Sequence, residues 1–149
     1  MATWQFDLHL MSQGEPPPTV SYDGLDIPGI PAKSALRVQE IVVAFLGKPW
    51  LMMDDWMVFG AETGTRVDLL FDDTDFVEVL VRLDAGVNNA AFLGAICALA
   101  LELDCCYFDG QGRQFIEPQR EHLVQALASS RAAKYVKNPR DFIAKIAPD

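Results

Sequence analysis

Apolar and polar residues alternate strictly over residues 4–10, which predicts a half-buried strand. The apolar positions are Trp4, Phe6, Leu8 and Leu10, and the polar positions between them are Gln5, Asp7 and His9. The pattern then changes, because residues 12–33 contain five prolines and three glycines. Proline fixes φ and has no N–H, so we expect this segment to form a long ordered loop. A loop of this length in a compact domain is often functional.

Four stretches carry helical patterns. After a candidate N-cap at Ser34, apolar residues recur at helical spacing until Gly47 and Pro49 end the pattern. These apolar residues are Val38, Ile41, Val42 and Phe45. Residues 89–103 are apolar on nearly every side, which predicts a deeply buried helix. A third helix is expected from about Pro118 into the 130s, and Asn138-Pro139 predicts a short terminal helix carrying Phe142 and Ile146.

The remaining segments have strand character. Residues 50–59 are extended, and β-like runs at 55–59, 65–71 and 76–84 are separated by the turn sequences GAETG and DDTD. Residues 105–108 and 113–116 flank DGQG and predict a hairpin. A meander plus a hairpin implies an antiparallel sheet with helices packed mainly on one face. We therefore predict a single α+β domain spanning residues 1–149.

The chain is acidic, and its charge is unevenly distributed. The formal net charge is −9, with 17 acidic and five basic residues in positions 1–110 but four acidic and seven basic in positions 111–149. General nucleic-acid binding is disfavoured, because neutralising phosphates requires a dominant basic surface.

Several features favour a soluble protein in a reducing compartment. Three cysteines, two of them adjacent, make a poor disulfide framework. The N-terminus lacks the basic region and apolar run of a signal peptide, and the apolar segment 90–101 is too short to cross a bilayer. We expect a cytoplasmic protein that does not associate with membranes.

The segment 53–84 concentrates charge, with nine carboxylates and only two basic residues. In its strands, apolar side chains alternate with charged ones, so a carboxylate rim around an apolar centre is expected on one sheet face. Such a face is typical of a solvated sheet, and it also suits binding of a basic protein. The candidate contact residues are Asp54, Asp55, Trp56, Asp68, Asp72, Asp73, Asp75 and Glu78. We expect five of them to be replaceable by serine without unfolding: Asp68, Asp72, Asp73, Asp75 and Glu78.

Other chemistry has weaker support. The sequence DDTD lacks the calcium-loop pattern, and two distant histidines disfavour zinc or non-haem iron. Acid/base candidates are Asp54 with Asp55 beside Trp56, or Glu102 with Asp104, but turns and helix ends explain these residues more simply. Cys105 or Cys106 with His122 would make a nucleophile and base, although buried cysteines are usually packing residues. Nucleotide-binding and hydrolase motifs are absent, so we assign no catalytic residue, metal or cofactor.

Three segments together resemble a bacterial immunity protein of the polymorphic-toxin type: DDWMVFG, RVDLLFDDTDFVEVLVRLD and CCYFDGQGRQFIEP. The resemblance implies a protein that binds a cognate toxin with a basic cleft and blocks its active site. Trp50, Trp56 and Tyr22 are candidate aromatic anchors for such a partner. The alternatives are a small enzyme or small-molecule-binding domain with a pocket between the sheet and the 12–33 loop, and a non-inhibitory adaptor or chaperone.

Overall fold

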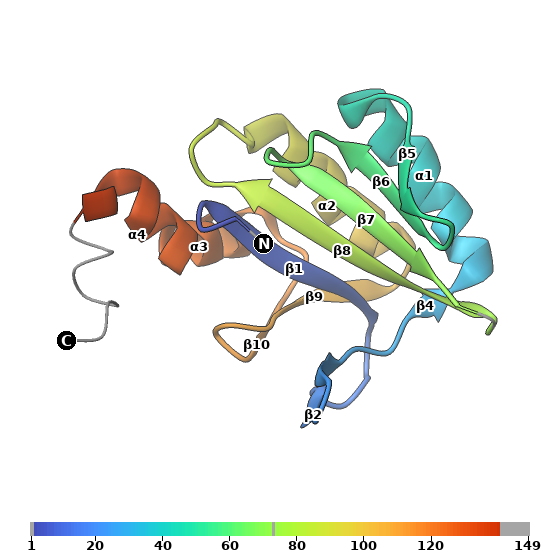
Figure 1. Ribbon diagram of the computed structural model, residues 1–149. Coiled ribbons are helices and arrows are strands. Elements are labelled where there is room, and N and C mark those ends of the chain that lie inside the picture. Colours follow the sequence, from blue (N-terminus) through green and yellow to red (C-terminus); the bar gives the residue numbers. More distant parts are fainter. Residues whose placement is uncertain (1, 73, 141–149) are drawn as a thin grey trace.

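The computed structural model describes residues 2–72 and 74–140, in which eight strands form one antiparallel sheet (Figure 1). Seven strands lie in the order β10-β9-β1-β8-β7-β6-β5, and β4 also pairs with β8. Their bounds are β1 Gln5–Ser12, β4 Ile30–Pro31, β5 Trp50–Met53, β6 Trp56–Gly60, β7 Arg66–Phe71, β8 Phe76–Asp84, β9 Cys105–Asp109 and β10 Gln114–Ile116. The predicted meander and hairpin are confirmed, and the N-terminal strand lies between them.

Helices cover one face of this sheet, which confirms the predicted α+β architecture. The helices are α1 (Ala32–Leu46), α2 (Ala90–Glu102), α3 (Arg120–Ala128) and α4 (Arg131–Lys137). In Figure 1, α1 and α2 lie behind the sheet, and the opposite face has no helix over it. The apolar residues of β1, β7 and β8 face the helices and form the main core with α2. The buried Tyr107 hydroxyl donates to the Ile96 carbonyl of α2 at 2.9 Å, which ties this helix to β9.

The prediction that the 12–33 segment is an ordered loop without regular elements is wrong. It contains a small hairpin of β2 (Thr19–Ser21) and β3 (Gly24–Asp26), followed by β4. Gly29 packs so closely on β8 that a Cβ there would lie 2.8 Å from the Val77 backbone, so only glycine fits. Helix α1 begins at Ala32, and the prediction of Ser34 as its N-cap is wrong. The N–H of Ala32 instead donates to the Asp75 carbonyl at 2.8 Å, which is a tertiary contact that no local pattern reveals.

The predicted third helix is two helices. Helix α3 ends at Ala128, and Ser130 then caps α4 by accepting a hydrogen bond from the Ala133 N–H at 3.1 Å. Serine favours such a cap because its hydroxyl satisfies a free N–H of the first turn. Asn138 lies at the end of α4, while Phe142 and Ile146 of the predicted terminal helix lie outside the described residues. Across the described ranges, no helix is both long and apolar enough to cross a membrane.

Candidate functional site

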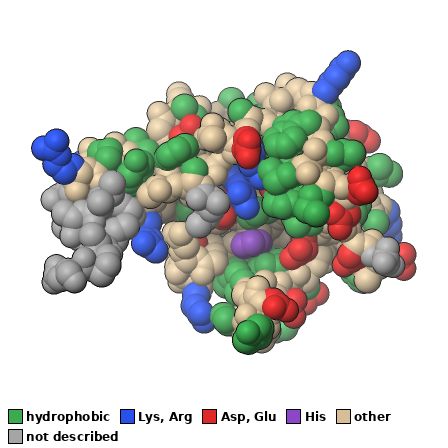
Figure 2. Space-filling view, in the orientation of Figure 1, with side chains coloured by type: hydrophobic (Ala, Val, Ile, Leu, Met, Phe, Trp, Pro, Cys, Tyr) green, Lys and Arg blue, Asp and Glu red, His purple; other side chains and the backbone are tan. Residues whose placement is uncertain are grey.

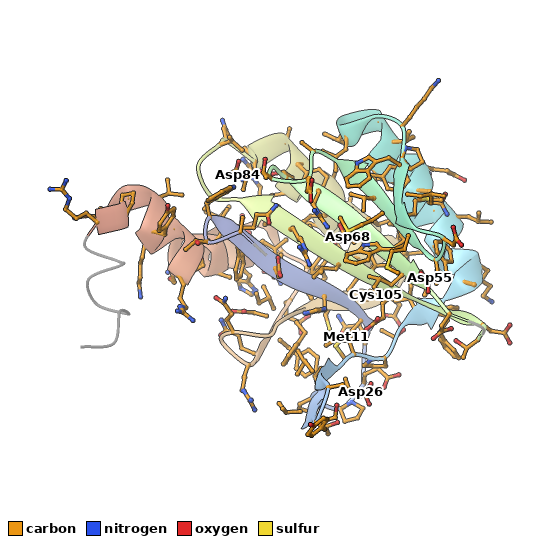
Figure 3. The ribbon with its side chains drawn as sticks, viewed as in Figure 1. Met11, Asp26, Asp55, Asp68, Asp84 and Cys105 are labelled. Atoms are coloured by element: carbon orange, nitrogen blue, oxygen red, sulfur yellow. The ribbon has the colours of Figure 1, made fainter. Side chains whose placement is uncertain are left out.

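One end of the sheet gathers exposed carboxylates and exposed apolar side chains. We call it the acidic sheet end, and it comprises Met53, Asp54, Asp55, Asp72, Asp75 and Phe76, all exposed. These residues come from the β5–β6 and β7–β8 turns, which lie side by side because the Phe71 N–H donates to the Asp55 carbonyl at 2.9 Å. Figure 3 shows Asp55 at this end of the sheet, and Figure 2 shows hydrophobic side chains there with carboxylates around them.

The apolar side chains of this region are unusually open to solvent. Met53 is 61% exposed, Phe76 is 51% exposed, and Leu51 of the neighbouring edge strand β5 is 60% exposed. Asp72 stabilises the β7–β8 turn, because its carboxylate accepts hydrogen bonds from the N–H and hydroxyl of Thr74. These bonds lower the Asp72 pKa, so this carboxylate stays charged. The acidic sheet end therefore combines a hydrophobic centre with a charged rim.

The other predicted contact residues lie elsewhere or are less accessible. Trp56 is half-buried, and its indole N–H donates to Asp68 Oδ2 at 2.9 Å. Glu78 is half-buried on β8, where burial raises its pKa. The prediction that Asp68 lies on an accessible rim is wrong, because this side chain is 0% exposed. Asp73 lies outside the described residues.

Figure 3 shows Asp68 in the middle of the helix-free face. It belongs to a row of charges from three adjacent strands, made of Asp7, Arg82, Asp68 and Arg66. We call it the central charge row. Arg66 donates to both Asp68 carboxylate oxygens, at 2.8 and 2.7 Å. Arg82 Nε lies 4.0 Å from Asp68 Oδ2 and 3.7 Å from Asp7 Oδ1. The Asp7–Arg82 pair lacks a hydrogen bond, and neither of these two buried atoms has a hydrogen-bond partner among residues 2–72 and 74–140.

Burial shifts the pKa values of the two titratable residues of β1, Asp7 and His9. Desolvation raises the pKa of Asp7 to about 6, although the nearby Arg82 opposes the shift. Desolvation also lowers the pKa of His9 to about 4, so its imidazole is neutral near pH 7. Both residues are polar positions of the alternating pattern in residues 4–10, and that pattern is the sequence signal that places them on one side of β1. The pattern does not reveal that other segments of the protein cover most of this side of β1.

The structure shows the surroundings of the predicted acid/base and thiol pairs. Glu102 is exposed and ion-paired with Arg37 at 2.6 Å, which lowers its pKa. Burial raises the pKa of Cys105 to about 11 and also raises that of Cys106, so both stay protonated thiols. His122 lies on the exposed side of α3 and lines an open cavity that neither cysteine lines.

Asp54 and Asp55 form a turn, and Asp104 adopts a left-handed φ of 54° directly after α2, as the simpler interpretation of these residues predicts. Among the described residues, no three His, Cys, Asp or Glu side chains are grouped so that they could hold a metal ion.

Comparison with known proteins gives no relative: no family, no curated protein and no solved structure matches this chain.

Proposed function

We propose that this protein is an inhibitory binding module that occupies the basic cleft of a toxin protein, in the manner of a bacterial immunity protein. The observation that carries the proposal is the acidic sheet end, where Met53 and Phe76 are exposed beside four described carboxylates. A protein with this role acts in the cytoplasm of the cell that must survive the toxin.

The two kinds of side chain have separate roles in this proposal. Met53, Phe76 and the adjacent Leu51 supply apolar area, whose burial against a partner slows dissociation. Asp54, Asp55 and Asp75 attract the basic cleft and speed the encounter, an effect that salt screens. The toxin's active site is then blocked because its positively charged cleft, which normally receives an anionic substrate, is filled.

Asp68 has a supporting role in this proposal and makes no contact with the toxin. Its hydrogen bond from Trp56 holds the start of β6, directly after the β5–β6 turn. The acidic sheet end is thereby presented on a rigid part of the sheet, which lowers the entropy lost on binding.

The partner can be identified by selection. Fragments of the source genome are expressed in a host cell with and without this protein, and fragments that stop growth only in its absence encode candidate toxins. A candidate is accepted when the purified pair forms a stoichiometric complex and this protein abolishes the toxin's activity.

Matched variants then test the surface. The triple change Asp54→Asn, Asp55→Asn, Asp75→Asn should slow association about tenfold at low salt, and the effect should shrink at high salt. Met53→Ala with Phe76→Ala should instead raise the dissociation rate. The control neutralises three exposed carboxylates elsewhere, by Glu15→Gln, Asp23→Asn and Glu117→Gln. If the control triple change slows association as much as the triple change in the acidic sheet end, the assignment of the acidic sheet end as the contact surface is refuted.

A further inference from the structure

A cavity of about 270 Å³ lies on the helix-free face, between the β2–β3 hairpin and the β9–β10 turn. It is lined by Asp7, His9, Val20, Leu25, Gly110, Gln111 and Arg113. None of these residues belongs to the acidic sheet end. In Figure 2 a histidine lies in a hollow of this face, which is the face on which the β1 register places His9. We call this cavity the hairpin pocket.

The hairpin pocket has an apolar wall that nothing in the described chain covers. Val20 and Leu25 are cross-strand partners on the hairpin, and Val20 is 56% exposed. The hairpin is held in place by a separate small cluster, in which Leu25 packs against the buried Met11, Ile27 and Phe108. The wall is therefore anchored, yet its Val20 surface is free to pack against a ligand.

The residues that line the pocket carry charges of both signs. Asp7 enters from β1, and Arg113 enters from the β9–β10 turn, where it forms no ion pair with any described carboxylate. His9 and Gln111 also line the pocket, and their side chains make no hydrogen bond within the described residues. A Cβ at Gly110 would lie 3.7 Å from His9 Nε2 and 3.1 Å from Leu25, so this glycine keeps the pocket open.

The Asp7 carboxylate lowers the stability of the folded protein at its position in the structure. Its Oδ1 is buried and has no hydrogen-bond partner in the described part of the chain, and desolvation outweighs the attraction of Arg82. A buried and poorly satisfied carboxylate lowers stability, so its presence calls for an explanation in terms of binding or catalysis. A cationic group in the pocket would give the Asp7 carboxylate a second charged partner in addition to Arg82.

We propose that the hairpin pocket binds a small zwitterion with an apolar side chain, such as a free branched-chain amino acid. The ammonium group lies on Asp7, the carboxylate group lies on Arg113, and the side chain packs on Val20 and Leu25. His9, whose ring is neutral near pH 7, and Gln111 supply hydrogen bonds to the ligand's polar end. This site is independent of the acidic sheet end, so either proposal can fail alone.

The test is a titration with L-leucine, followed by NMR signals of the His9 ring and of the Gly110 and Gln111 amides. His122 is the second of two histidines and does not line this pocket, so its ring signals give an internal control. Two half-ligands are titrated in parallel: 3-methylbutylamine lacks the carboxylate, and 4-methylpentanoate lacks the ammonium. L-Leucine should bind at least about tenfold more tightly than either, because each lacks one charge-assisted contact.

Variants test each contact separately. Asp7→Asn and Arg113→Gln should each weaken L-leucine binding about tenfold or more, while Arg120→Gln on α3 should leave it unchanged. Gly110→Ala should weaken binding without any change of charge, by narrowing the pocket against Leu25. Circular dichroism and urea unfolding show that each variant is folded before its affinity is compared.

Three results would overturn the proposal. The first is the absence of His9 shifts up to about 20 mM L-leucine, a concentration well above the affinity expected of such a contact set. The second is equal binding of L-leucine and either half-ligand. The third is undiminished binding by folded Asp7→Asn and Arg113→Gln variants.

Discussion

Replacing Asp68 by alanine should strongly destabilise the protein, although sequence reasoning treated this residue as a replaceable surface carboxylate. The side chains of Asp68 and Arg66 are 0% and 3% exposed, and two hydrogen bonds of 2.7 and 2.8 Å join them. The Trp56 indole N–H also depends on Asp68. Without Asp68, the Arg66 guanidinium keeps its bond to the Glu62 carbonyl but has no counter-charge in direct contact.

The expected loss is about 3–5 kcal/mol, the range for removing one partner of a buried ion pair. For a chain of this length, that corresponds to a fall of about 6–20 °C in Tm. The double change Arg66→Met, Asp68→Leu should recover most of the loss, because it removes both charges and leaves none uncompensated. Asp55→Ala is the matched control on the same sheet, and since Asp55 is exposed its effect should stay within about 0.5 kcal/mol.

Urea unfolding followed by tryptophan fluorescence and circular dichroism measures all three variants. The reasoning is refuted if Asp68→Ala costs less than about 1 kcal/mol, or if the double change is as unstable as the single one. The first result would mean that water reaches Arg66. The second would mean that Asp68 acts mainly by holding Trp56.

Three further predictions concern pH, backbone packing and thiol reactivity. Burial raises the Asp7 pKa in the folded state from its ordinary value of 3.8 to about 6, so Asp7 lowers stability progressively as pH rises from about 4 to 6. The free energy of unfolding of the Asp7→Asn variant should therefore exceed that of the wild type by up to about 3 kcal/mol at pH 7.5 and equal it at pH 3.5. A variant less stable than the wild type at pH 7.5 would contradict this prediction. Gly29→Ala should lower the free energy of unfolding by about 1–3 kcal/mol, measured in urea, because the new Cβ would press on the Val77 backbone. An unchanged unfolding midpoint would show that β4 can shift freely. The three cysteines are buried, and burial raises their thiol pKa values. At pH 8, Ellman's reagent should therefore label them at least about 100-fold faster in denaturant than in the native protein. Rapid labelling of the native protein would contradict their burial.

Local patterns predicted much of this fold. Alternation identified β1 and β8, the almost uncharged stretch 89–103 identified α2, and the glycine and aspartate clusters identified the turns of the meander. The two exposed carboxylates of the β5–β6 turn, Asp54 and Asp55, were also placed correctly. These features follow from backbone geometry and turn chemistry, which depend on residues close together in the chain.

Other features depend on contacts between distant segments. Helix α1 begins at Ala32 because its N–H reaches the Asp75 carbonyl, so the nearby Ser34 was a misleading cap signal. The 12–33 segment contains a hairpin because Leu25 packs against Met11 and Phe108 of the sheet. Neither contact can be recognised from the local sequence pattern.

For the candidate sites, the sequence by itself determined which side chains share a face of each strand. It placed Asp7 and His9 together, and likewise Arg66 and Asp68, because successive side chains of a strand point to opposite faces. Only the tertiary structure decided that β1 lies beside β8, so that Asp7 is opposite Arg82, and that Asp68 is buried while Asp55 is exposed. The physical reason is that alternation is a property of one strand, whereas access to water depends on every segment that packs over it.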